Sequence, residues 1–149
     1  MILRWLVAAV HLFALGIGLG SVLARAAALR ELPDPRALRR AVRADNLWAL
    51  AALLWISTGL WRAFGGLEKG SAYYLGNHIF LAKMGMLVLI IALEVLPIVT
   101  FIRWRAQTAR GAAVDTSRAP TLARISVIQA VLVVCMVFAA TAMARGLGI

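Results

Sequence analysis

The sequence predicts an all-α protein, a four-helix transmembrane bundle. Hydrophobic residues make up 63% of the chain and the mean hydropathy is +0.89, whereas roughly 45–50% apolar residues is usual for soluble domains. A helix needs about 20 residues to cross a hydrocarbon core of ~30 Å. Four apolar stretches come close to that length, and they are residues 5–24, 47–64, 79–102 and 125–144.

No polar segment is long enough to form a separate water-soluble domain. We therefore expect a single integral membrane domain over residues 1–149. Its helices are expected at approximately residues 3–27, 46–64, 75–104 and 122–146.

The basic residues are unevenly placed, and this predicts the orientation in the membrane. Eleven of the 16 flank or lie in the first and third loops, whereas four lie on the opposite side. Because Arg-rich loops stay in the cytoplasm, both termini are expected on the outer, periplasmic side of a bacterial inner (plasma) membrane. The net charge of +10 then indicates contact with anionic lipid rather than nucleic acid. The eleven residues are Arg25, Arg30, Arg36, Arg39, Arg40, Arg43, Arg103, Arg105, Arg110, Arg118 and Arg124.

The first helix is expected to have two distinct faces. His11, Gly18 and Arg25 are seven residues apart and fall near one line along the helix. Gly16 and Gly20 form a small-xxx-small pair on roughly the opposite side. Such a pair permits close helix contact in lipid, either within the bundle or between copies in a homo-oligomer.

Residues 33–35, with the sequence Pro-Asp-Pro, are expected to stop any helix that continues from the first span. Residues 36–43 are expected to form a short amphipathic helix on the cytoplasmic surface. Asp45 and Asn46 would then serve as N-cap residues for the second transmembrane helix.

The third helix contains Pro97, which is expected to bend it. The fourth helix is apolar apart from Ser126, Gln129 and Thr141. The single cysteine, Cys135, excludes an intramolecular disulfide and a CxxC site.

Three ionisable side chains interrupt the apolar background: His11, Lys83 and Glu94. Each costs several kcal/mol or more in a membrane unless it is paired, hydrated or able to reach the interface. For His11 two interpretations are open. The imidazole could be held by one hydrogen bond to a neighbouring helix, or it could be the axial ligand of a haem iron.

Lys83 has two interpretations as well, because the start of its helix is uncertain in the sequence. In a shallow register its side chain snorkels to the outer surface. In a deeper register it needs an anionic partner such as a haem propionate or a substrate carboxylate. Glu94 is about 16 Å further along the helix, too far for direct contact, so the sequence identifies no partner for it.

Two further residues are candidates at the outer side. His78 could be a second haem ligand opposite His11, if both lie at the same depth, and otherwise is an interfacial histidine. Arg62 is expected to be a snorkelling anchor, with pairing to a headgroup or a propionate as the alternative.

Several segments resemble the DUF2214 family of predicted bacterial membrane proteins. They are Thr58-Gly59-Leu60-Trp61-Arg62, Lys69-Gly70-Ser71-Ala72-Tyr73-Tyr74, Asn77-His78-x-Phe80-x-x-Lys83-Met84 and Pro97-x-x-Thr100-Phe101-Ile102-Arg103-Trp104-Arg105. Together with the first-helix histidine, the resemblance covers most of the chain.

A more distant similarity is to the HemJ-type protoporphyrinogen oxidases and the CopD copper-resistance membrane proteins. It is based on a histidine in the first helix, an arginine at the far end of that helix and a lysine opening the apolar third helix. Similarity to the HemJ-type enzymes implies a b-type haem in a four-helix bundle, with His11 as axial ligand. It also implies that Arg25 and Lys83 bind or polarise anionic groups.

The leading hypothesis from the sequence is a haem-b-binding redox protein, which would be an oxidoreductase if it is an enzyme. One alternative is a transport or permeation component in which Lys83 and Glu94 line a path for an anion, proton or metal ion. Another is a small scaffold or assembly partner of a larger membrane complex. The sequence contains no GxGxxG, P-loop or HExxH motif, which argues against the enzyme classes that use them.

Overall fold

A computed structural model describes residues 1–67 and 71–148, so Lys69 and Gly70 of the quoted segments lie outside the described residues. These residues form four long helices and one short helix, with no strand. Each long helix is long and apolar enough to cross a membrane, which confirms the predicted all-α bundle. The helices are α1 (Ile2–Arg30), α2 (Pro35–Phe64), α3 (Ser71–Leu75), α4 (His78–Ala109) and α5 (Ala119–Ala144).

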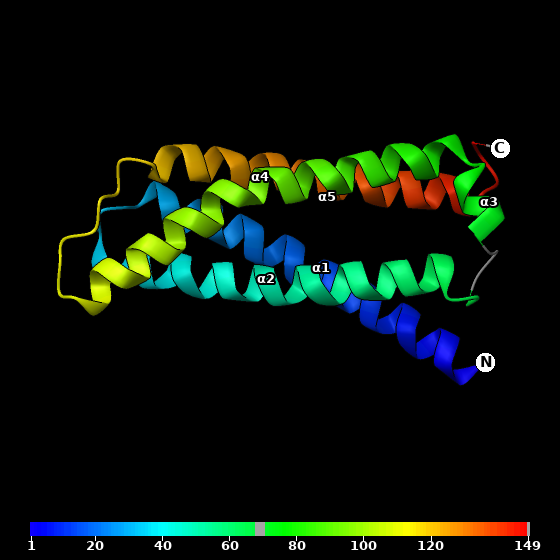
Figure 1. Ribbon diagram of the computed structural model, residues 1–149, viewed down its shortest axis with the longest axis horizontal. Coiled ribbons are helices and arrows are strands. Elements are labelled where there is room, and N and C mark those ends of the chain that lie inside the picture. The colour runs from blue at the N-terminus through cyan, green and yellow to red at the C-terminus, as the bar shows by residue number, and fades with distance from the viewer. Residues whose placement is uncertain (68–70, 149) are drawn as a thin grey trace.

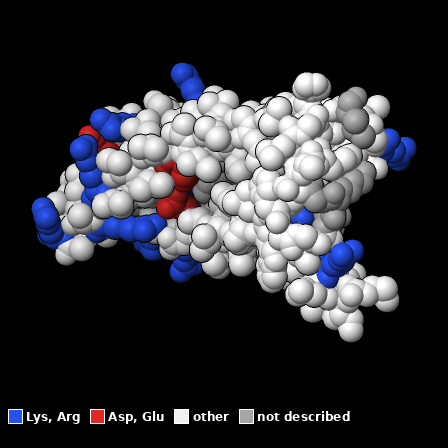
Figure 2. Space-filling view, turned by 45° about the vertical axis from the view of Figure 1, so that its right-hand side comes forward, with Lys and Arg blue, Asp and Glu red and all other residues white. Residues whose placement is uncertain are grey.

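The four long helices run up and down in an elongated bundle (Figure 1). Helix α1 packs along α2 and α5, and α4 packs along α5. Both termini and α3 lie at one end, which we call the terminal end, and the connections 31–34 and 110–118 lie at the other, the arginine-rich end (Figure 1). Lysine and arginine side chains gather at that second end in Figure 2. The assignment of the terminal end to the outer side of the membrane stays a prediction.

The Pro-Asp-Pro segment separates the first two helices as predicted, since α1 ends at Arg30 and α2 begins at Pro35. Asp34 is the N-cap of α2, and its side chain accepts a hydrogen bond of 2.8 Å from the backbone N–H of Arg36. Proline at the first position and aspartate at the N-cap are both favourable starts for a helix. Helix α2 therefore begins eleven residues before the predicted position 46.

The prediction of a separate amphipathic helix over residues 36–43 is wrong. Helix α2 continues without a break from Pro35 to Phe64, so Asp45 and Asn46 lie inside it rather than capping it. The physical reason is packing. Ala37 and Ala41 are fully buried in the bundle, so this segment is held by the protein core instead of lying free on a membrane surface.

Helix α4 begins three residues later than predicted because Asn77 caps it, accepting a 3.1 Å hydrogen bond from the backbone N–H of Phe80. It extends to Ala109, contains Pro97, and curves in its middle (Figure 1). The Thr100 hydroxyl, one turn after Leu96, donates to the Leu96 carbonyl at 2.8 Å.

The apolar core is thickest in the middle and at the arginine-rich end. Trp48, Ile90 and Val133 belong to the central cluster, whereas Phe101 and Trp104 belong to the cluster at the arginine-rich end. Towards the terminal end only a small cluster of buried residues remains, comprising Ala63, Phe80 and Met143. The N-terminal part of α1 also diverges from the other helices there (Figure 1). This is the end of the bundle at which a cavity opens.

Candidate functional site

The first polar site of the bundle is centred on Arg25, whose side chain is fully buried. Its Nε donates to Ser126 Oγ at 3.0 Å, and Nη1 donates to Asp45 Oδ1 at 2.9 Å and to Glu94 Oε1 at 2.8 Å. Nη2 donates to Glu94 Oε2 at 3.1 Å and to Gln129 Oε1 at 2.7 Å. A guanidinium has five N–H groups, so these five bonds use all of them and tie α1, α2, α4 and α5 together.

The acceptors around Arg25 are equally well used. Glu94 Oε2 also accepts from Trp48 Nε1 at 3.1 Å and from Gln129 Nε2 at 2.7 Å. Asp45 Oδ2 accepts from Arg105 Nη2 at 3.1 Å. Buried charges persist when they are paired and their remaining hydrogen bonds are satisfied. We call this group the Arg25 cluster, and it comprises Arg25, Asp45, Trp48, Glu94, Arg105, Ser126 and Gln129.

The Arg25 cluster corrects two expectations. Glu94, for which the sequence identified no partner, is paired with Arg25. Arg25, which was grouped with the arginines of the first loop, lies inside the bundle because α1 continues to Arg30. A signal for this was present in the sequence, because Arg25 falls on the same helical line as His11 and Gly18, which pack inwards.

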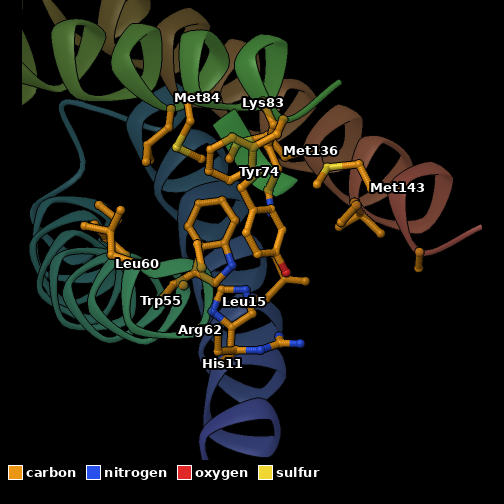
Figure 3. Close-up of a pocket in the computed structure, with 18 of the residues that line it drawn as sticks. His11, Leu15, Trp55, Leu60, Arg62, Tyr74, Lys83, Met84, Met136 and Met143 are labelled. Atoms are coloured by element: carbon orange, nitrogen blue, oxygen red, sulfur yellow. The ribbon is translucent and has the colours of Figure 1, made fainter. Parts of the chain in front are cut away.

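The second polar site is a cavity of about 500 Å³ near the terminal end. Figure 3 shows side chains from α1, α2, α4 and α5 converging on it. None of the described residues that line it is acidic. We call it the His11 cavity, and the lining residues labelled in Figure 3 are His11, Leu15, Trp55, Leu60, Arg62, Tyr74, Lys83, Met84, Met136 and Met143.

His11 is held against α2 in one ring orientation. Its Nδ1 lies 3.0 Å from Thr58 Oγ1, and the Thr58 hydroxyl donates its own proton to the Leu54 carbonyl at 2.6 Å. The hydroxyl must therefore accept from His11, which places the ring proton on Nδ1 and leaves a lone pair on Nε2. The hydrogen bond to a neighbouring helix, one of the two interpretations open for His11, is present, and no described residue is hydrogen-bonded to Nε2.

Two neighbours on α2 shape the position of this ring. His11 stacks on Trp55, with ring centroids 5.9 Å apart and an interplanar angle of 26°. Gly59 lets the ring approach the helix, because a Cβ at that position would lie 3.0 Å from His11 Cε1. A side chain at position 59 would therefore push the imidazole away from α2.

Two cations, Arg62 from α2 and Lys83 from α4, also line the cavity. They lie near enough to interact electrostatically. Lys83 makes no hydrogen bond or ion pair with any residue in the described part of the chain. Because α4 begins at His78, Lys83 is about 8 Å along the axis from the helix start. The depth of Lys83 in the membrane stays a prediction, and its side chain lies on the cavity wall.

The remaining two candidates are not part of this site. His78 is exposed at the first residue of α4, where its backbone N–H donates to the Gly148 carbonyl at 3.0 Å. It lies outside the cavity lining, as does Arg25. Arg25 is about 21 Å along α1 from His11. The structure thus brings His11, Arg62 and Lys83 together and separates them from His78 and Arg25.

A tryptophan of α2 also lines the cavity. Trp55 is 7% exposed, and its indole Nε1 is buried without a hydrogen-bond partner in the described structure. An orphaned buried donor costs about 1–3 kcal/mol, so an acceptor supplied by a ligand would relieve it. The sequence contains no signal for this, because the missing partner is a property of packing.

The cavity presents a lone pair, two cations and an orphaned N–H on walls that are mainly apolar and also carry Tyr73, Tyr74 and Thr141. The described residues contain no group of three or more His, Cys, Asp or Glu side chains placed to hold a metal ion. A single imidazole is nevertheless a sufficient protein ligand when a macrocycle supplies the other nitrogens, as in haem proteins. The residues present fit a large anionic, largely apolar ligand that carries a metal.

Fold and sites together define a small α-helical membrane protein of the multi-pass type. Residues 3–148 match the family described as predicted membrane protein DUF2214, and the chain belongs to that family. This confirms the resemblance to DUF2214. No curated protein and no solved structure matches the chain, so the similarity to HemJ-type and CopD proteins stays a prediction.

Proposed function

We propose that the protein is a haem-b-binding redox protein of the membrane, with Nε2 of His11 as the axial ligand. The observation that carries this proposal is the hydrogen bond from His11 Nδ1 to Thr58, which leaves Nε2 unprotonated on the wall of a cavity. Metal-bound histidines usually donate their second ring N–H in this way, which fixes the ring and raises its basicity.

The other walls of the cavity support the same ligand. Its volume of about 500 Å³ is within the roughly 300–1,000 Å³ of typical ligand pockets. Apolar and methionine side chains suit the faces of a macrocycle, whereas Lys83 and Arg62 suit its carboxylates. Bound haem would supply one-electron chemistry, and an enzyme built on it would be an oxidoreductase.

The first test is a reduced-minus-oxidised optical spectrum of the protein purified from haem-replete cells. We expect haem bands in the wild type and their loss in His11→Ala. His78→Ala is the matched control, because it removes a histidine outside the cavity and should leave the bands unchanged. A colourless wild-type protein, or equal loss in the two variants, would contradict axial ligation by His11.

A second test concerns the cations. In a titration of haem-free protein with haemin, Lys83→Gln should weaken binding about fivefold, which corresponds to roughly 1 kcal/mol for a part-buried ion pair. Lys83→Arg keeps the charge and should retain most of the affinity. Equal affinities for wild type and Lys83→Gln would remove the proposed role of Lys83.

The alternatives predict different outcomes of the same experiments. A transport or permeation component would be colourless and would show a solute flux that depends on Lys83. Glu94, the second residue of that hypothesis, is engaged in the Arg25 cluster rather than in the His11 cavity. A scaffold would be insensitive to both cavity substitutions and would co-purify with stoichiometric partners.

Two partner interactions belong to the proposal. Gly16 and Gly20 lie on an outward face of α1, and a Cβ added at either position would have no atom within 4 Å. We propose this face as a contact between copies of the chain, to be tested by disulfide cross-linking of Gly16→Cys in a Cys135→Ser background. The arginine-rich end is proposed to contact anionic lipid in the inner (plasma) membrane of a bacterium.

A further inference from the structure

The first turns of α2 carry four arginines on one helix face. Arg36, Arg39, Arg40 and Arg43 are spaced by three, one and three residues, which places them together on the outward side. With Asp34 they line a hollow of about 480 Å³, which we call the arginine hollow. The opposite face of the same turns is buried in the bundle. The four guanidinium groups are thus carried by a rigid, well-packed segment.

The charges of the arginine hollow are largely uncompensated by the described residues. Arg40 forms an ion pair with Glu31. The Asp34 side chain is engaged by the backbone N–H of Arg36. Arg36, Arg39 and Arg43 form no ion pair with any residue from 1–67 or 71–148. An anion of more than one charge would therefore find several guanidinium groups ready to bind it.

The height of the hollow relative to the apolar span indicates the source of that anion. Arg43 precedes Leu47, the first residue of the apolar stretch, by about 6 Å along the helix, and Arg36 precedes it by about 16 Å. The headgroup layer on each side of a bilayer is roughly 5–8 Å thick. The lowest of the arginines therefore lies at the level of the lipid phosphates, and the long side chains of the others can reach back toward that layer. Together the four guanidinium groups offer more donors than one phosphate uses.

We propose that the arginine hollow binds the headgroup of a membrane lipid that carries two phosphates. Guanidinium groups bind phosphate oxygens through paired, charge-assisted hydrogen bonds. A second phosphate engages the arginines that one phosphate leaves unused. A general attraction to anionic lipid would instead depend only on charge density. The connection 110–118 at the same end also carries exposed arginines, so it would then attract the lipid as well.

The experiment compares cardiolipin with phosphatidylglycerol at equal total phosphate, using the full-length protein in detergent and native mass spectrometry to count retained lipid. The wild type should bind cardiolipin about tenfold more tightly. Replacing Arg36, Arg39 and Arg43 by glutamine should abolish this preference. The matched control replaces Arg103, Arg110 and Arg124, which removes the same charge from the same end and should preserve the preference.

Three outcomes would overturn the proposal: no preference in the wild type, an equal loss in the two triple variants, or binding of dissolved pyrophosphate as tight as that of the lipid. The last result would indicate a soluble diphosphate ligand. Circular dichroism checks that each variant is folded. If the triple variant does not fold, Arg39→Gln and Arg43→Gln are measured singly, each with an expected partial loss of the preference, and Arg110→Gln is their control.

Discussion

The bundle contains two polar sites that solve the problem of buried charge in different ways. In the Arg25 cluster all five guanidinium N–H groups are donated to acceptors from the same chain. In the His11 cavity, by contrast, Lys83 has no ion pair with a described residue and the Trp55 N–H has no acceptor. Both sites remove ionisable or polar groups from water, but only one of them compensates the loss internally.

This difference indicates which site is structural and which binds a ligand. A completed network holds four helices in register and has no remaining capacity for a ligand. An incomplete set of donors around a cavity gains free energy when a ligand supplies the missing acceptors. We therefore expect substitutions in the Arg25 cluster to change stability more than substitutions in the His11 cavity.

The largest effect is expected from Arg25→Ala. Removing Arg25 leaves the Glu94 carboxylate buried without its ionic partner, and such a loss costs about 3–5 kcal/mol in the free energy of unfolding. Denaturant unfolding in detergent micelles measures this. Arg124→Ala, an exposed arginine on α5, is the control and should change stability by less than about 0.5 kcal/mol.

Adding Glu94→Gln to Arg25→Ala should recover part of the loss, because it removes the carboxylate that Arg25 had paired, whereas Asp45 keeps its ion pair with Arg105. If Arg25→Ala unfolds like the control, the cluster does not hold the bundle together. The Arg25 cluster could then no longer be distinguished from the His11 cavity as the structural site.

A second prediction uses two tryptophans of the same helix. Trp48→Phe and Trp55→Phe remove the same ring volume, but the Trp48 N–H donates to Glu94 at 3.1 Å and the Trp55 N–H has no partner. Trp48→Phe should therefore be the more destabilising by about 2 kcal/mol in the haem-free protein. Unfolding of the two variants side by side gives this difference. Equal losses would mean that the Trp55 N–H is satisfied in the membrane.

The smallest effect concerns two glycines that face inwards. A Cβ at Gly18 would lie 3.5 Å from Ala51 and Trp48, an ordinary contact, whereas at Gly59 it would lie 3.0 Å from the His11 ring. Gly18→Ala should be neutral or stabilising by up to about 1 kcal/mol, since alanine favours the helix. Gly59→Ala should displace the imidazole and, under the proposed function, shift the haem bands. Identical haem spectra for the two variants would contradict ligation by His11.

Much of the architecture could be predicted from residue patterns. The four apolar stretches predicted the four long helices, because a chain that crosses hydrocarbon must satisfy its backbone within each helix. The seven-residue spacing of His11, Gly18 and Arg25 predicted that they share one line along the helix, and the structure adds that this line faces inwards. The errors lie where local signals compete with packing. Asp45 and Asn46 are good N-cap residues, but α2 is capped earlier, at Asp34. The first turns of α2 stay helical because their alanines are buried in the bundle.

Residue identity and spacing are enough to show that His11, Lys83 and Glu94 are ionisable groups within apolar helices, and that each of them needs a partner. Which partner each one has depends on how the helices pack. Glu94 is neutralised by an arginine 69 residues away, and His11 is oriented by a threonine 47 residues away, whereas Lys83 is left facing a cavity. Pairings between helices depend on how the helices rotate and tilt against one another, and those angles follow from the packing of the entire bundle, not from the residues near each charge.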